Sequence, residues 1–168
     1  LLSTPLCIDP KGNEGLNPQK TEPTNPLYSL DKQQSSLVYY DKNTIVLTMP
    51  YWVKVTNSSV EDSEVKKHSF VLSYDPEAMT ASDTKLKLYI SHVVEDAGET
   101  VTRSNFTYAY RAYSIRAALA AFKEKTGKLP KYLELTAEIN NSKDELVDKD
   151  GKETSVERSV EYDYAFTE

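Results

Sequence analysis

The sequence is poor in the residues on which most catalytic and metal sites depend. It contains one cysteine, two histidines and five glycines in 168 residues. A lone cysteine cannot form an internal disulfide bond, and the chain has no glycine-rich loop of the kind that cradles phosphate groups. No apolar run approaches the roughly 20 residues that span a bilayer. These absences favour a protein that is not an enzyme and that uses no cofactor.

Basic residues are also outnumbered. The chain has 20 Lys+Arg against 26 Asp+Glu, which gives a formal net charge of −6. Proteins that bind nucleic acid need a basic patch, but here the basic residues are scattered among acidic ones. We therefore expect no nucleic acid partner. The hydrophobic content of 39% argues against a chain that is disordered throughout.

Residues 1–34 differ in composition from the rest of the chain. They hold five of the eight prolines, and proline fixes φ and removes a backbone donor. This stretch is expected to form an extended linker or a strap over the fold, and the alternative is a tail without fixed structure. The chain opens with Leu1 rather than methionine, so we expect a processed or truncated start that lacks any export signal. Cys7 is not expected to carry a lipid, because Leu6 rather than a small residue precedes it.

From residue 35 onward the apolar residues alternate with a period of two, which is typical of strands. Residues 84–94 and 154–166 show the alternation most clearly. Pro50 is expected to interrupt the strand that begins at residue 44, which then resumes as a second strand or after a bulge. Further strands are predicted at 67–74, 101–112 and 132–140, with a polar loop at 57–66. The pattern indicates one domain over 35–168, an antiparallel β-sandwich of about seven strands, Ig-like or similar.

One helix is predicted near residues 114–126. Ile115, Leu119 and Phe122 form a single apolar stripe at helical spacing. The hydroxyl of Ser114 is expected to cap the N-terminus, and Gly127 suits a left-handed C-terminal stop. We expect this helix to cover an open end of the two sheets.

The two histidines lie in line with apolar residues, and no polar cluster is expected around them. If strands 67–74 and 84–94 pair, one register places His68 opposite His92 and Phe70 opposite Ile90. Two facing imidazoles could belong to a metal site or a pH switch. Zinc sites need three or more protein ligands as a rule, and no third ligand is evident. The pair is a weak candidate for a metal site, and the alternative is two partly buried histidines at the margin of a sheet.

Tyrosine is the residue in excess, with 12 in the chain. Exposed tyrosines can bind a glycan or a protein, because the ring is apolar and the hydroxyl is polar. The alternative is structural, since tyrosine favours strands and i, i+2 spacing places rings on one core or margin face. The candidate binding residues are Tyr39, Tyr108, Tyr110, Tyr162 and Tyr164.

The segment KKHSFVLSYDPE at 66–77, followed by TKLKLYISH at 84–92, resembles the C-terminal β-sandwich domain of the NigD-like proteins, outer-membrane lipoproteins of Bacteroidetes. The resemblance covers roughly residues 37–166. It implies an envelope lipoprotein without known enzymatic activity, located in the periplasm or on the outer-membrane surface. Membrane attachment would come only from a lipid anchor outside this chain. The positions that carry the resemblance are His68, Tyr74, Asp75, Pro76, Leu88 and His92.

The leading interpretation is a non-catalytic β-sandwich domain of a bacterial cell-envelope lipoprotein, with a binding or structural role. The second is a glycan- or protein-binding module of an adhesin or a pilus-type surface protein, which would use the exposed tyrosines. A hydrolase with an unrecognised pair of carboxylates is the third.

Overall fold

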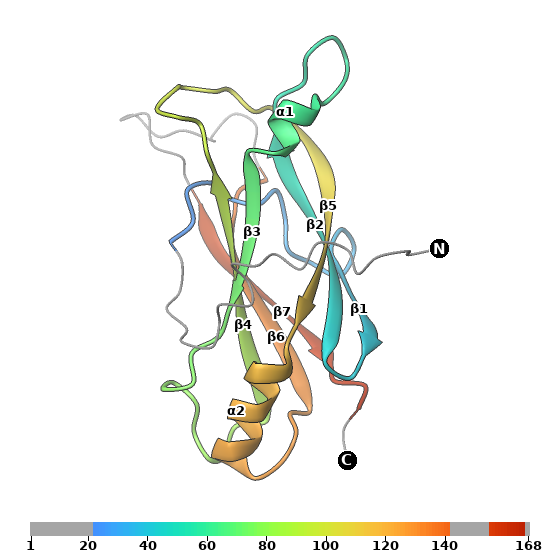
Figure 1. The fold of residues 1–168 in the computed structure, drawn as a ribbon, viewed down its shortest axis with the longest axis vertical. Helices are drawn as coiled ribbons and strands as arrows, with labels where there is room; N and C mark the ends of the chain where they lie inside the picture. The colour runs from blue at the N-terminus through green and yellow to red at the C-terminus, as the bar shows by residue number, and fades with distance from the viewer. Residues whose placement is uncertain (1–21, 142–154, 167–168) are drawn as a thin grey trace.

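The structure is a computed structural model that describes residues 22–141 and 155–166, which form a sandwich of two β-sheets (Figure 1). One sheet has the strand order β1-β2-β5 and the other the order β3-β4-β6-β7. The predicted β-sandwich of about seven strands is confirmed. The strands are β1 Ser36–Asp41, β2 Thr44–Val53, β3 His68–Ser73, β4 Lys85–Val94, β5 Asn105–Ser114, β6 Tyr132–Ile139 and β7 Val156–Asp163.

The predicted alternations place apolar side chains in the core between the two sheets. Every second residue of β2, β4 and β6 faces inward, and these residues are almost completely buried. The core residues on these three strands include Ile45, Leu47, Met49, Leu86, Leu88, Ile90, Leu133, Leu135 and Ala137.

One strand pairing departs from the expected antiparallel arrangement. β4 and β6 are parallel neighbours, although the other pairs are antiparallel. A parallel pair needs a crossover connection of a dozen or more residues. Here the connection contains β5, which belongs to the opposite sheet, and α2 (Arg116–Thr126). The chain therefore crosses from one sheet to the other and back between these two strands.

The predicted interruption of β2 at Pro50 is wrong. The strand runs through Pro50 without a break. The pairing with β1 ends at Thr48, so β2 has no β1 partner at Pro50. The Pro50 carbonyl instead accepts a hydrogen bond of 3.0 Å from the amide of Tyr28. The nitrogen and the carbonyl of one residue point to the same side of a strand, so the nitrogen of Pro50 also points away from β5. Its missing N–H therefore removes no hydrogen bond from the β2–β5 pairing.

The helix α2 lies at the lower end of the sandwich in Figure 1, as expected. Its stripe of Ile115, Leu119 and Phe122 is buried, and Gly127 has the left-handed φ of 79° at the C-cap. The predicted N-cap is wrong, because Ser114 is the last residue of β5 and the cap position falls on Ile115, which makes no side-chain cap bond. The Ile115 amide donates to the Asn43 carbonyl at 2.7 Å.

A second, short helix, α1 (Asp62–Val65), lies at the opposite end, in the region predicted as a loop. Before the first strand, the segment 22–34 packs across both sheets. Its Leu27 is fully buried and bridges Tyr51 of β2 and Ile139 of β6. The remainder of the proline-rich stretch, residues 1–21, lies outside the described residues.

Candidate functional site

β3 and β4 pair antiparallel, but the register differs by two residues from the predicted one. Phe70 lies opposite His92, and His68 lies opposite Val94. A shift of two keeps the same side chains facing inward, so the hydrophobic alternation cannot distinguish the two registers. The two imidazoles still meet, along a diagonal: His68 Nδ1 lies 2.8 Å from His92 Nε2, and the rings stack with their centroids 5.0 Å apart.

Both rings lie within the aromatic part of the core. His68 and His92 are 5% and 1% exposed. The ring of Phe70 stacks on His92 with an interplanar angle of 2°, and the ring of Tyr51 meets both imidazoles edge-on. The expected alignment of the histidines with core residues is confirmed.

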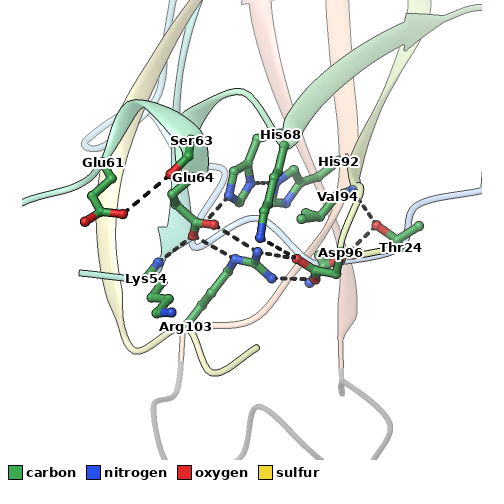
Figure 2. A network of polar contacts seen from close by, with 12 residues as sticks. Thr24, Lys54, Glu61, Ser63, Glu64, His68, His92, Val94, Asp96 and Arg103 are labelled. Atoms are coloured by element: carbon green, nitrogen blue, oxygen red, sulfur yellow. Dashed lines mark hydrogen bonds and ion pairs between the residues drawn. The ribbon is translucent and has the colours of Figure 1, made fainter. Parts of the chain in front are cut away.

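The expectation that no polar cluster surrounds the histidines is wrong, because a buried polar network lies beside them (Figure 2). Arg103 joins two carboxylates. Its Nε and Nη2 donate to Glu64 at 2.9 and 3.0 Å, and its Nη1 and Nη2 donate to Asp96 at 2.8 and 2.6 Å. Glu64 Oε2 also accepts the Lys54 amide at 2.6 Å and lies 3.4 Å from His68 Nε2. We call these residues the His–Glu–Arg network: Glu64, His68, His92, Asp96 and Arg103.

Sequence reasoning missed the charged members of this network. Glu64 lies in a stretch that reads as a polar loop, and Arg103 precedes β5 in a segment of mixed charge. The two are 39 residues apart in the chain, and both are 5% exposed. A buried charge is costly unless it is paired, but the sequence does not tell which of many surface-type charges will be buried. Only the four-residue spacing of Glu64 and His68 could have pointed to their contact.

Burial and pairing set the charges of the network. Burial raises the pKa of Glu64, but the hydrogen bonds from Arg103 and from the Lys54 amide outweigh it and hold that pKa at about 2. Burial also lowers the pKa of Arg103, yet its two carboxylate partners raise it overall. The Asp96 pKa is lowered, chiefly by its hydrogen bonds from Arg103. At neutral pH, two carboxylates therefore face one guanidinium.

Both histidines are neutral at the same pH. Burial lowers the pKa of His68, and the neighbouring Glu64 only partly offsets this. Burial and the adjacent His68 lower the pKa of His92 to about 3. Among the described residues, no group of three or more His, Cys, Asp or Glu side chains is arranged to hold a metal ion. The network instead connects α1, the start of β3, the end of β4 and the segment before β5.

Three of the five candidate tyrosines lie in the seam between the edge strands β1 and β7. Tyr39 donates its hydroxyl to the Asp163 carbonyl, and Tyr164 donates to the Lys42 carbonyl, both at 2.7 Å. Tyr162 is partly buried against the core. The expectation of exposed tyrosines is not met at Tyr164, which is 3% exposed, because the two sheets close over it.

The other two candidates, Tyr108 and Tyr110, lie on the outer face of β5 together with Phe106. Their side chains are 41%, 56% and 40% exposed, respectively. The register extends this face onto β2 and β1, as far as Val46 and Val38, because directly opposite residues on neighbouring strands share a face. Beyond these residues the charged Asp41 lies opposite Thr44. Tyr28 stacks on Phe106, with the ring centroids 4.0 Å apart. We call this surface the uncharged face: Tyr28, Ser36, Val38, Val46, Thr48, Phe106, Tyr108 and Tyr110.

The outer face of the other sheet has a different character. It carries Lys85, Lys87, Glu134 and Glu161 in adjacent rows. Lys85 Nζ lies 2.6 Å from a carboxylate oxygen of Glu161 and 3.7 Å from one of Glu134. This is the usual charged and solvated surface of a half-buried sheet, and the uncharged face departs from it.

No family model matches the chain, and the search of curated proteins finds no match either. A solved structure does match. The chain is similar to a protein of Bacteroides fragilis NCTC 9343 described as a "Putative lipoprotein". The two structures superpose with a TM-score of 0.69 and 26% sequence identity, and the match covers 89% of this chain. It spans 66% of the length of that protein.

The two proteins share a fold, and the neighbour is described as a lipoprotein. The assignment of this chain to the NigD-like proteins stays a prediction. Within the described part of the chain, no helix is both long and apolar enough to cross a membrane.

Proposed function

We propose that this chain is a non-catalytic binding domain of a bacterial cell-envelope lipoprotein of the NigD-like type, and that the uncharged face is its binding surface. The likeness to a lipoprotein supports a location in the periplasm or at the outer-membrane surface. A lipid anchor outside this chain would provide the membrane attachment. The binding role rests on one observation: aromatic rings are exposed side by side among the residues of the uncharged face, and the charged Asp41 lies only at the end of this sheet face, opposite Thr44.

The absence of charge is significant because 27% of the chain is charged. A charged group that is covered by an uncharged partner loses its hydration, which costs free energy unless it is paired. The uncharged face avoids this cost. Tyrosine and other aromatic residues are also enriched where proteins bind partners, because their rings supply large contact areas at small entropic cost.

The size of the uncharged face indicates the kind of partner. Three strands about 4.8 Å apart, over about eight residues of ~3.4 Å each, give an area of roughly 400 Å². A stable protein interface buries about 800 Å² on each partner. The uncharged face is therefore better suited to one extended chain than to a globular protein. Its hydroxyl groups can both donate and accept hydrogen bonds, as the hydroxyls of a sugar do. We propose a neutral surface glycan as the ligand.

The non-catalytic part of the proposal is supported by the state of the buried carboxylates. A glycosidase of the usual kind needs two carboxyl groups that flank an open cleft. Glu64 is buried and Asp96 is partly buried, and both are bound to the same guanidinium. Neither is free to act as an acid or a base on a substrate.

Binding is tested with an array of neutral and acidic polysaccharides, followed by calorimetry on any hit. The double variant Tyr108→Ala/Tyr110→Ala is expected to weaken binding tenfold or more, because each stacked ring contributes about 1 kcal/mol. Lys87→Ala, on the charged face of the other sheet, is the control and should bind normally. Equal loss in both variants, or binding only to acidic glycans, would contradict the assignment. Binding to a protein alone would retain the surface and replace the ligand class.

The lipoprotein part has its own test. The intact mass and N-terminus of the native protein are measured from the membrane fraction. A lipidated N-terminus on a longer chain is the expected result. An unlipidated protein found only in the soluble fraction would contradict the envelope assignment.

A further inference from the structure

The hydrogen-bond pattern of the His–Glu–Arg network fixes which nitrogen of each histidine carries a proton. His92 Nδ1 lies 3.0 Å from the Pro26 carbonyl oxygen. A carbonyl oxygen only accepts hydrogen bonds, so His92 Nδ1 is the donor. Neutral His92 then has a bare Nε2, which accepts. Because His92 Nε2 lies 2.8 Å from His68 Nδ1, that His68 nitrogen must carry the hydrogen.

This assignment of hydrogens leaves His68 Nε2 without a hydrogen, although it faces a carboxylate oxygen. In neutral His68 the remaining nitrogen, Nε2, is an acceptor, and it faces Glu64 Oε2 at 3.4 Å. The Glu64 carboxylate is also an acceptor. Both side chains are buried, and within the described residues His68 Nε2 has no hydrogen-bond partner. Two lone pairs therefore point at each other inside the protein, with no hydrogen between them.

We infer that the gap between His68 Nε2 and Glu64 Oε2 is a binding site for a single proton, and that its occupancy controls how firmly α1 is held against β3. An added proton forms an N–H bond at Nε2 and converts the contact into a charged hydrogen bond to Glu64. The His68 Nδ1–H···His92 bond is unaffected by this step. The proton comes from solvent, and no other bond is broken. This inference is independent of the proposed glycan binding.

The surrounding charges favour uptake at this position. Glu64 from α1 and Asp96 after β4 are negative, and Arg103 before β5 is positive, so the network carries one net negative charge when His68 is neutral. A proton on His68 makes it neutral. Lys67 Nζ lies 3.9 Å from Asp96 and is partly exposed to solvent. The described neighbours on other strands include Tyr51 of β2, which is uncharged, and Arg111 of β5, which lies over the Phe70 ring.

His92 cannot take up the first proton in the same way. A proton on its Nε2 would face the hydrogen on His68 Nδ1, so the bond between the rings would be lost. Among residues 22–141 and 155–166, no carboxylate contacts this nitrogen to compensate. The network is therefore expected to fill in a fixed order: His68 first, with the pair intact, and His92 only in strong acid, with the pair broken.

The test is nitrogen NMR of protein labelled at histidine, titrated from pH 8 to pH 4. At pH 8 both rings should show a hydrogen on Nδ1 only. On acidification His68 should gain a proton at Nε2 while His92 stays neutral, and the protection factor of the Lys54 amide, which corrects for the intrinsic slowing of exchange in acid, should rise relative to that of the other amides as α1 tightens. A hydrogen on Nε2 of either neutral ring would overturn the inference, as would both rings titrating together near pH 6.5.

Glu64→Gln removes the charge that receives the proton, and the matched control is Glu61→Gln on the exposed start of α1. In Glu64→Gln the midpoint of His68 should fall by about one pH unit or more, because an opposite charge at this distance shifts a pKa by that amount. Glu61→Gln should leave it unchanged. An unchanged His68 midpoint in Glu64→Gln would overturn the inference. If that variant does not fold, the tautomers and the order of titration in the natural sequence still decide the matter.

Discussion

The buried His92 gives the protein a pH-dependent stability whose sign and size follow from its environment. In the folded protein its pKa is about 3, whereas in the unfolded chain it has the ordinary value of about 6.5. Above pH 6.5 the ring is neutral in both states and contributes nothing to the pH dependence. Below pH 6.5 the unfolded chain binds a proton that the folded protein does not. Stability is therefore lost as the pH falls, down to about pH 3.

The magnitude is large for a domain of this size. One pKa unit corresponds to about 1.4 kcal/mol, so His92 alone should remove about 2 kcal/mol of the free energy of unfolding by pH 5. The loss would approach about 5 kcal/mol near pH 3, against a total stability of about 5–15 kcal/mol for typical domains. His68 adds to the loss, because burial lowers its pKa as well.

The assay is urea unfolding at several pH values between 7.5 and 5, a window above the range in which the carboxylates titrate. His92→Gln keeps a polar side chain that cannot be protonated. The variant is expected to be less stable at every pH, because it loses ring contacts with Phe70 and Tyr51. Its stability should, however, fall less steeply below pH 6.5, by up to about 1.4 kcal/mol per pH unit. Equal slopes for both proteins would refute the reasoning.

Three further predictions concern stability and can be checked by the same unfolding assay. Arg103→Met leaves Glu64 buried without its cation and should cost about 3–5 kcal/mol; adding Glu64→Leu should recover part of this loss, and no recovery would contradict the pairing argument. Gly127→Ala should cost about 1 kcal/mol through its φ of 79° alone, since no atom obstructs the new Cβ; no loss would exclude the left-handed cap. Leu27→Ala should cost about 2–5 kcal/mol, because this residue is buried between the sheets, and a negligible effect would show that segment 22–34 does not contribute to the core.

The sequence predicted the parts of this fold that depend on near neighbours. The period-two alternation in β2, β4 and β6 assigns each side chain to a face, since residues two apart always share one. The stripe of α2 and the left-handed Gly127 are likewise properties of a few consecutive residues. These features could be predicted because they do not depend on which strands pair with one another.

The tertiary structure decided what depends on distant partners. The sequence does not determine the register of β3 against β4. Two registers that differ by two residues bury the same side chains, and the tertiary structure selects one of them. Closure of the two sheets buried Tyr164, just after β7, and left Tyr110 of β5 exposed, although the alternation predicted both to lie in strands. The contact of Glu64 with Arg103 joins residues 39 positions apart. A charge is solvated or buried according to what folds over it, and that is a property of the whole chain rather than of any segment.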